Sequence, residues 1–365
     1  MNRAYNFGAG PAMLPLEVLQ DAQNELLNWQ NTGMSVLEIG HRTDTFMQLM
    51  EDAEQSLRNL LNIPDTYSVL FLGGAARMQF GMIPLNFIKP GQTAGYLITG
   101  LWSHLAYEEA RRLKNAYCIA SGEQAAFHSV PPVSDWHYQD NSAYLYYTPN
   151  ETVNGLRCVT PPNHANIPLM ADMTSCLLSE PLDVTNFGLI FAGAQKNIAN
   201  AGLTIVIVRK DLVNAIEDES ITTMLDYRVH AKNHSLYATP PTFNCYLAMK
   251  MFQWIEKEGG VDSLYKKNIA NANALYDYID ASSFYQCHVA VQDRSLLNVC
   301  FSLSNPTLEQ PFVEAAHNIG LLALKGHRTV GGLRASMYNA MPPEGVARLI
   351  TFMEDFARNH KVLRS

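Results

Sequence analysis

The strongest chemical signal in the sequence is a lysine that follows a buried segment of small residues. Lys196 ends the segment FAGAQK, and a second apolar run, from Leu203 to Val208, begins soon after it. A lysine between two core strands is either paired with a charge or used chemically, because burying an ammonium group is unfavourable. Burial lowers the pKa of an amine, and the neutral amine is the nucleophile that forms a Schiff base with a carbonyl. We therefore interpret Lys196 as a catalytic residue.

A carboxylate stands in a matching position after another apolar run. Asp172 ends the segment LMAD. A lone aspartate at a strand end is usually a helix cap. Beside a nucleophilic lysine, however, it can keep a pyridine ring nitrogen protonated, which increases the electron-withdrawing power of the ring and stabilises a carbanion at the α-carbon of a substrate.

Further candidates follow other strand-like segments, at the edge of the sheet where parallel α/β proteins bind ligands. Gly73 and Gly74 lead into a helical stretch, and the free N–H groups at a helix N-terminus attract anions such as phosphate. Taken singly, a glycine pair is more often a simple turn, and a tryptophan at a helix start is more often part of the core. The candidates at this edge are Ala76, Arg77, Trp102, Thr152 and Gln195.

Two histidine–arginine pairs indicate an anionic substrate. His41 and Arg42 follow a loop, and His327 and Arg328 lie in the segment KGHRTVGGLRAS, which also contains Arg334. Arginine offers a planar fork that matches carboxylates and phosphates, and histidine adds a donor whose charge responds to pH. Such pairs are commonly exposed loop residues. Two of them with a third arginine, in a chain of net charge -8, favour a local anion-binding site.

Composition limits the remaining classes of function. The 365 residues suit two domains, at roughly 150 residues per domain. With 47% hydrophobic and 16% charged residues the chain is globular, and its negative charge disfavours nucleic acid as a partner. Its six cysteines form no CxxC pair, which is typical of reduced thiols in a cytoplasmic protein. We see neither a secretory signal nor an apolar run of the ~18 residues that a membrane span needs.

A metal site is not expected. His230 and His234 are four residues apart, but no HExxH motif accompanies them, and their polar surroundings predict exposed side chains.

The order of elements predicts an α/β fold with an open, mainly parallel sheet. Short apolar runs alternate with helical stretches up to about residue 240, and the β-branched run LTIVIV is typical of a strand buried on both faces. Helices are expected at 75–87, 102–113, 243–257, 261–279 and 343–360, and later strands at 296–303 and 333–338. We predict a large domain of residues 16–257 and a smaller C-terminal α/β domain of residues 258–365. The smaller domain also includes residues 1–15.

Several longer segments resemble one enzyme family. They are NFGAGPAMLP, SVLEIGHR, YTPNET, ADMTS, FAGAQKNIANAGLTIVIVR, TPPTF and LKGHRTVGGLRASMYNAMP. The chain is similar to the phosphoserine aminotransferases, class V enzymes of fold type I that use pyridoxal 5'-phosphate (PLP), from Phe7 to Ala357. The AGAQK segment alone would indicate only the broader class, whereas the two segments that contain GHR are specific.

The resemblance implies a role for each candidate. Lys196 would hold the cofactor as a Schiff base and move the proton, Asp172 would pair with the ring nitrogen, and Trp102 would stack on the ring. Thr152 would bond the phenolic oxygen, and Arg334 would bind the α-carboxylate of the substrate. The cofactor phosphate would be held by Ala76, Arg77, Gln195, Ala238 and Thr239, the last from a partner subunit. The substrate phosphate, or the side-chain carboxylate of glutamate, would be held by His41, Arg42, His327 and Arg328.

The sequence departs from the family pattern at a few positions. Ala9 stands where a serine is common, so one hydroxyl contact near the substrate is absent. Ala238 replaces a common asparagine, which puts one side-chain contact to the cofactor phosphate in doubt. The glycine-rich loop lacks part of its usual pattern at residues 72–76, and Asn200 replaces a frequent proline without a consequence that we can name.

The expected reaction is reversible amino transfer between glutamate and 3-phosphohydroxypyruvate, which gives O-phosphoserine and 2-oxoglutarate, in a homodimer with shared sites. A phosphorylated hydroxythreonine, on the route to pyridoxine, is a further substrate that the resemblance implies. The alternatives are another class V enzyme, such as an alanine–glyoxylate aminotransferase or a cysteine desulfurase, or a catalytically silent protein on the same scaffold. The histidine–arginine pairs argue against the first, and the presence of Lys196 and Asp172 argues against the second.

Overall fold

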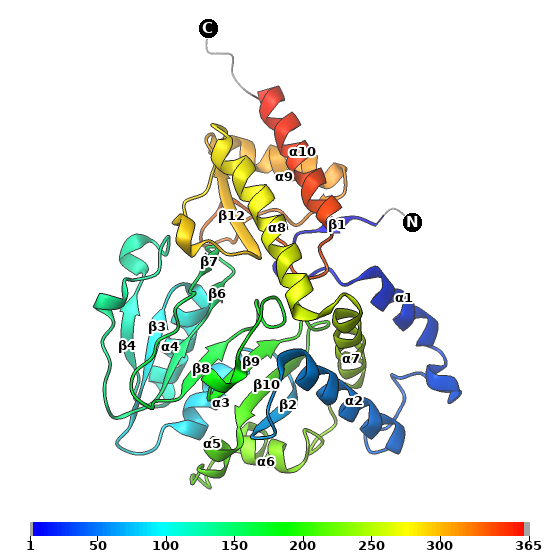
Figure 1. The fold of residues 1–365 in the computed structure, drawn as a ribbon, viewed down its shortest axis with the longest axis vertical. Coiled ribbons are helices and arrows are strands. Elements are labelled where there is room, and N and C mark those ends of the chain that lie inside the picture. Colours follow the sequence, from blue (N-terminus) through cyan, green and yellow to red (C-terminus); the bar gives the residue numbers. More distant parts are fainter. Residues whose placement is uncertain (1–2, 361–365) are drawn as a thin grey trace.

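The computed structural model describes residues 3–360, and a seven-stranded sheet forms its centre (Figure 1). Across the sheet the strands are β2 (Tyr67–Gly73), β10 (Leu203–Arg209), β9 (Leu189–Gly193), β8 (Leu169–Asp172), β5 (Ser142–Tyr147), β3 (Thr93–Ile98) and β4 (Tyr117–Ser121). Neighbours from β9 to β4 are parallel, which confirms the predicted α/β sheet. β10 is antiparallel to both of its neighbours, and its apolar pattern did not reveal this because the pattern reports burial and not direction.

Both faces of the sheet are covered. Alternate residues of β2 enter different cores: Val69 and Phe71 pack on one side, and Leu70 and Leu72 on the other. The first core is covered by α1 (Leu16–Glu25), α2 (Asp44–Leu61) and α7 (Thr242–Lys257). The second is covered by α3 (Met78–Phe87), α4 (Leu101–Leu113), α5 (Lys210–Asn214) and α6 (Tyr227–Lys232).

Cap residues determine where α2 begins and ends. The Thr43 side chain accepts a hydrogen bond from the backbone N–H of Phe46, and Asn62 ends the helix in the left-handed conformation at φ 51°. The buried residues Phe46, Leu49, Met50, Ala53 and Leu57 follow helical spacing, so a single face of α2 contacts the sheet.

The C-terminal part of the chain builds a second, smaller layer with its own core. Three antiparallel strands, β11 (Tyr285–Gln286), β12 (Asn298–Leu303) and β14 (Leu333–Ser336), pack with α8 (Gly260–Ala281), α9 (Glu309–Asn318) and α10 (Pro343–His360). The N-terminal strand β1 (Tyr5–Asn6) pairs with β13 (Leu321–Leu322), and Phe7 joins this core. Figure 1 shows the blue N-terminal strand beside the red C-terminal helix.

The helix α8 contacts both cores. Val261 and Leu264 pack in the large core, whereas Ala272, Leu275 and Ile279 pack in the small one. The division into 16–257 and 258–365 with 1–15 therefore stays a proposal, and residues 1, 2 and 361–365 of it lie outside the described part.

Most predicted elements are found within a few residues of their expected bounds, and α10 spans the predicted residues. The helix expected from residue 75 begins only at Met78, because Gly74 has φ +121° and a turn follows it. In the described part of the chain, no helix is both long and apolar enough to cross a membrane.

Candidate active site

A cavity of about 360 Å³ lies at the carboxyl ends of the parallel strands. Asp172 comes from the end of β8, Lys196 follows β9, Trp102 lies in the first turn of α4, and Arg334 is in β14. The sheet and the small layer thus both contribute. Of the candidates from the sequence, the cavity brings together Ala76, Arg77, Trp102, Thr152, Asp172, Gln195, Lys196, His327 and Arg334.

Lys196 is buried in the wall of this cavity. Burial lowers the pKa of its ammonium group to about 8, although the Asp172 carboxylate acts in the opposite direction. The N-terminal segment packs against it: a Cβ atom on Gly10 would lie 3.6 Å from Lys196 Cγ, and Gly10 has φ +140°. Near neutral pH roughly a tenth of such amines are uncharged, which gives Lys196 the properties of a usable nucleophile.

Asp172 is also buried, at the end of β8. Its Oδ1 accepts a hydrogen bond of 2.9 Å from the backbone N–H of Thr174. Burial raises the pKa of this carboxyl, while the hydrogen bonds from Thr174 and the charge of Lys196 oppose the rise. The carboxylate therefore lies in a dry environment where a protonated ring nitrogen would be a strong partner.

The side chains of Trp102 and Thr152 are hydrogen-bonded to each other in the wall of the cavity. The indole Nε1–H donates to Thr152 Oγ1 at 3.0 Å. Because the Thr152 oxygen accepts this bond, its own proton remains available for an acceptor in the cavity. The Arg77 guanidinium lies 5.4 Å from the centre of the Trp102 ring.

The start of α3 offers free donors to an anion. The backbone N–H groups of Ala76 and Arg77 have no acceptor among the described residues. Ala76, Arg77 and Gln195 all line the cavity, and the helix dipole adds a partial positive charge. This part of the cavity suits a phosphate group.

Arg334 is fixed by one hydrogen bond, from Nη1 to the backbone oxygen of Thr152 at 2.9 Å. His327 accepts a hydrogen bond at Nδ1 from the Thr329 N–H at 3.3 Å. Burial, followed by the charges of Arg334 and Arg328, lowers the pKa of His327, so this ring is neutral near pH 7. With Nδ1 as acceptor, His327 carries its proton on Nε2 and can donate it to an anion.

Five candidates do not line this cavity: His41, Arg42, Arg328, Ala238 and Thr239. Arg42, Arg328 and Thr239 are exposed. The Nε2 atom of His41 is buried without a hydrogen-bond partner among the described residues. One chain alone therefore brings together the candidate cofactor residues except Ala238 and Thr239, and only part of the candidate anion site.

The residues present fit a cofactor with a flat ring and a phosphate. Thr148 lines the cavity, and its buried Oγ1 has no partner within residues 3–360. That oxygen, the free N–H groups of Ala76 and Arg77 and the Thr152 hydroxyl are unused hydrogen-bonding groups that such a molecule can satisfy. Thr148, Asn150 and Ser175 were missed in the sequence, although they lie within or beside the segments YTPNET and ADMTS.

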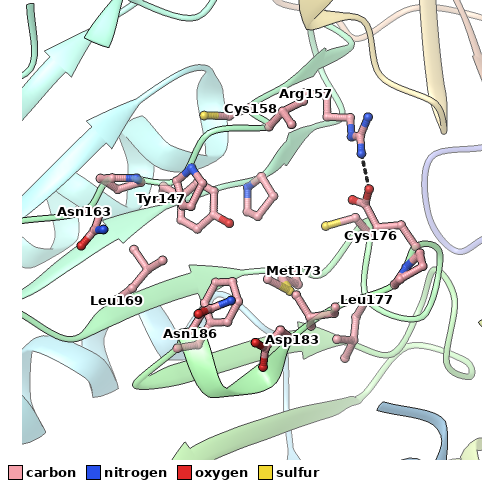
Figure 2. A pocket seen from close by; sticks show the side chains of 18 of the residues that line it. Tyr147, Arg157, Cys158, Asn163, Leu169, Met173, Cys176, Leu177, Asp183 and Asn186 are labelled. Carbon is pink, nitrogen blue, oxygen red and sulfur yellow. Dashed lines mark hydrogen bonds and ion pairs between the residues drawn. The ribbon is translucent and has the colours of Figure 1, made fainter. Parts of the chain in front are cut away.

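A second cavity, of about 560 Å³, lies on the other side of the loop that follows β8 (Figure 2). Its one arginine, Arg157, is ion-paired with Glu180, and no lysine is among the described residues that line it. Burial raises the pKa of the Cys158 thiol to about 12 and that of Cys176 well above its usual value. No cysteine is among the described residues that line the Lys196 cavity, which argues against a cysteine desulfurase.

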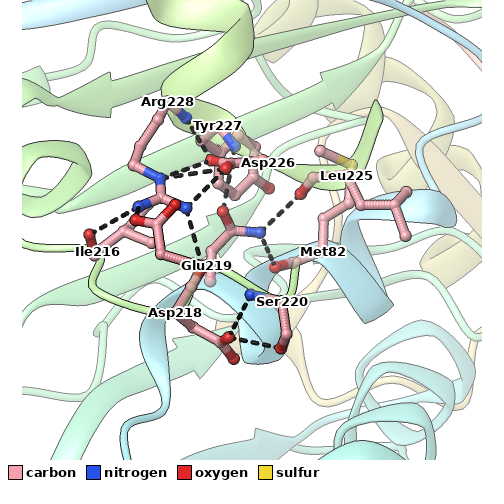
Figure 3. Close-up of polar contacts among 10 residues, drawn as sticks. Met82, Ile216, Asp218, Glu219, Ser220, Leu225, Asp226, Tyr227 and Arg228 are labelled. Carbon is pink, nitrogen blue, oxygen red and sulfur yellow. Dashed lines mark hydrogen bonds and ion pairs between the residues drawn. The ribbon is translucent and has the colours of Figure 1, made fainter. Parts of the chain in front are cut away.

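Arg228, a cation of the large layer outside this cavity, is already neutralised by acidic neighbours. Figure 3 shows Arg228 bound by Asp226 and Glu219, and it also donates to the Ile216 carbonyl. His230 is buried, with Nε2 2.9 Å from the Met224 oxygen, so the prediction that both histidines are exposed is wrong for His230. The cause is the short helix α6, which turns this side chain inward. No group of metal-binding side chains occurs in the described part.

This chain is similar to known proteins over almost its whole length. The family model described as "Aminotransferase class-V" matches residues 4–349. The phosphoserine aminotransferase of Legionella pneumophila is 58% identical over 98% of this chain and 99% of its own. A solved phosphoserine aminotransferase from Bacillus circulans subsp. alkalophilus has a TM-score of 0.96 and 46% identity, covering 98% of this chain and 99% of its own. A PLP-bound phosphoserine aminotransferase from Trichomonas vaginalis has a TM-score of 0.93 and 38% identity, covering 96% and 100%.

Proposed function

We propose that the cavity of this chain catalyses reversible amino transfer between glutamate and 3-phosphohydroxypyruvate. The chain belongs to the phosphoserine aminotransferases, within the class-V aminotransferase family. The products are 2-oxoglutarate and O-phosphoserine. The observation that carries the proposal is the buried pair of Lys196 and Asp172 in one cavity with Arg334. No other described cavity combines a buried amine, a buried carboxylate and a free guanidinium.

The cofactor is PLP, which supplies an electron-withdrawing ring and a carbonyl that accepts the amino group. Lys196 Nζ would hold it covalently and would move the proton at the substrate α-carbon. Asp172 would keep the ring nitrogen protonated, and Trp102 would pack against the ring. Thr152 would donate its free hydroxyl proton to the ring oxygen, and the Ala76 and Arg77 N–H groups with Gln195 would hold the phosphate.

The substrate contacts use the cations that remain free. Arg334, anchored to the Thr152 carbonyl, presents its other N–H groups to the α-carboxylate. His327 donates to the phosphate of phosphoserine or to the side-chain carboxylate of glutamate. His41, Arg42 and Arg328 complete this anion site, as the resemblance implies.

A homodimer accounts for the candidates that this chain leaves outside its own cavity. Thr239, with Ala238 beside it, reaches the cofactor phosphate from the partner, and we propose that His41 and Arg42 also cross the interface. Large apolar side chains are exposed in the same stretch of sequence, between residues 16 and 47: Leu16, Leu19, Leu27, Met34, Leu37 and Met47. An apolar surface of this kind is typical of an interface between protein subunits.

The reaction belongs to serine biosynthesis. The same site also fits a second substrate, the phosphorylated hydroxythreonine of pyridoxine biosynthesis, because that molecule has a phosphate at one end and an amino-acid group at the other. We propose the cytoplasm as its location, in accord with cysteines that are free in the structure. An alanine–glyoxylate type of activity is not favoured, because its substrates carry no phosphate for His327 and Arg328 to bind.

The test is the variant Lys196→Ala, assayed with phosphoserine and 2-oxoglutarate. We expect the visible absorption of the bound cofactor to be lost and the rate to fall by orders of magnitude. Lys267→Ala is the matched control: burial lowers the pKa of Lys267 as well, but its amine donates to the Asn339 oxygen outside the cavity. If Lys196→Ala retains both absorption and activity, another lysine carries the reaction.

A further inference from the structure

The helix that carries Trp102 has no side chain at its N-cap. The N-cap of α4 is Gly100, and Trp102 and Ser103 are the second and third residues of the helix. The backbone N–H groups of a first helical turn have no partner inside the helix, and a side chain at the N-cap normally accepts one of them. Glycine cannot do so.

Glu151 supplies the missing acceptors from the hairpin of β6 (Asn150–Glu151) and β7 (Leu156–Arg157). Its Oε2 accepts from the Trp102 N–H at 3.0 Å, and its Oε1 accepts from the Ser103 N–H at 2.8 Å. Oε1 also accepts from the Ser103 hydroxyl at 2.7 Å. One carboxylate, 49 residues further along the chain, therefore caps two successive N–H groups of α4.

The approach of this carboxylate requires the glycine. A Cβ atom on Gly100 would lie 2.6 Å from Glu151 Cδ and 2.6 Å from Asn154 Oδ1, which is closer than packed atoms allow. Gly100 has an extended backbone at φ 176°, so the requirement is for space and not for an unusual conformation. Gly100 and Glu151 thus form one local arrangement.

Glu151 does not reach the cofactor cavity itself. Its side chain is completely buried, and it is absent from the residues that line the cavity, although Asn150 and Thr152 on either side do line it. Burial raises the pKa of Glu151 to about 7, against the hydrogen bonds from Ser103 and Trp102. The three hydrogen bonds that Glu151 accepts from Trp102 and Ser103 offset part of the cost of burying its carboxyl group.

We infer that Glu151 is a positioning residue, which holds the first turn of α4 and thereby sets the Trp102 indole over the cofactor ring. Two bonds then fix Trp102 from one short segment: Glu151 holds its backbone N–H, and Thr152 holds its indole N–H. The inference rests on the proposed function in one respect, namely that Trp102 contacts PLP.

The experiment is a double-mutant cycle read out by PLP affinity of the apoprotein, using PLP itself as the probe. Glu151→Gln keeps the shape but turns an NH₂ group toward N–H donors, so one cap is lost. We expect the Kd for PLP to rise by about tenfold in Glu151→Gln, and by less than about twofold when the same change is made in a Trp102→Ala background, which has no ring to position. Near-UV circular dichroism of the apoprotein reports whether the Trp102 environment changes.

Glu109→Gln on the same helix is the matched control, because Glu109 is partly exposed and paired only with Arg112. It should leave the Kd unchanged. Gly100→Ala, which displaces Glu151 without altering a charge, should reproduce the weaker binding and keeps the test valid if Glu151→Gln folds poorly.

Each outcome has a distinct meaning. An equal loss from Glu151→Gln in both backgrounds overturns the inference, because Glu151 then acts without Trp102. A Kd that Glu151→Gln leaves unchanged also overturns it. If Trp102→Ala alone leaves PLP affinity unchanged, the proposed contact of Trp102 with the cofactor is wrong, which is separate from any effect of Glu151.

Discussion

The two halves of the site differ in how completely one chain builds them. The cofactor half, around Lys196 and Asp172, is buried at the strand ends, and its side chains are held by the sheet and by α4. The anion half draws on exposed residues: Arg42 and Arg328 lie outside the cavity, and only His327 and Arg334 reach it.

This difference follows from the physical chemistry of each half. The cofactor chemistry needs shifted pKa values, and those require burial, which the rigid sheet provides. Recognition of a phosphate needs fully charged groups, and those remain charged at little cost in loops that keep contact with water. A site whose charged half lies on loops is also one that a second subunit can complete.

The largest effect is expected in the buried half, from Asp172→Asn. This change keeps the shape but removes the negative charge that holds the ring nitrogen protonated. We expect PLP to stay bound, as seen by its absorption, while the transamination rate falls by orders of magnitude. The control is Asp183→Asn, an exposed residue outside the cofactor cavity. A wild-type rate in Asp172→Asn would exclude the proposed role.

A smaller effect, confined to particular substrates, is expected in the exposed half from Arg328→Ala. Loss of one charge-assisted contact should lower kcat/KM for phosphoserine by roughly ten- to a hundredfold. Glutamate should also be affected, whereas alanine, held through Arg334 alone, should lose much less. Arg358→Ala, an exposed cation of α10, serves as control. An equal loss for all three donors would show that Arg328 supports the fold or the dimer instead.

The smallest effect is expected at the boundary between the halves, from Ala238→Asn. This change restores the amide that is common in the family at this position. If a backbone donor or Thr239 already serves the cofactor phosphate, PLP binding should tighten by no more than ~1 kcal/mol, the net contribution of one hydrogen bond. Titration of the apoprotein with PLP measures it. A gain of several kcal/mol would mean that this chain holds its cofactor weakly.

The same division explains what could be predicted from the sequence. Lys196 and Asp172 were predicted because each ends an apolar run, so burial and chemistry were visible together. The antiparallel direction of β10 could not be predicted, because the residues between β9 and β10 do not indicate in which direction the next strand runs. The role of Glu151 could not be predicted, because it caps a helix whose residue Trp102 lies 49 residues earlier in the chain. No local sequence pattern indicates a helix cap from so distant a residue.

The surroundings of His230 were misjudged for a related reason. Its neighbours in the sequence are polar, yet α6 turns the ring inward to the Met224 oxygen. His41 and Arg42 were expected in the anion site, yet neither lines the cavity of this chain, and a sequence alone does not place loop residues relative to a cavity.

The most direct test of the account mixes two impaired variants, Lys196→Ala and Arg42→Ala, each with a different affinity tag. If Arg42 acts across the dimer, the hybrid contains one site with both residues intact. Random exchange then restores about a quarter of wild-type activity, because half of the dimers are hybrids and half of their sites are complete. Activity no greater than the sum of the two parents, in hybrids purified through both tags, would contradict the claim that a second chain completes the anion half.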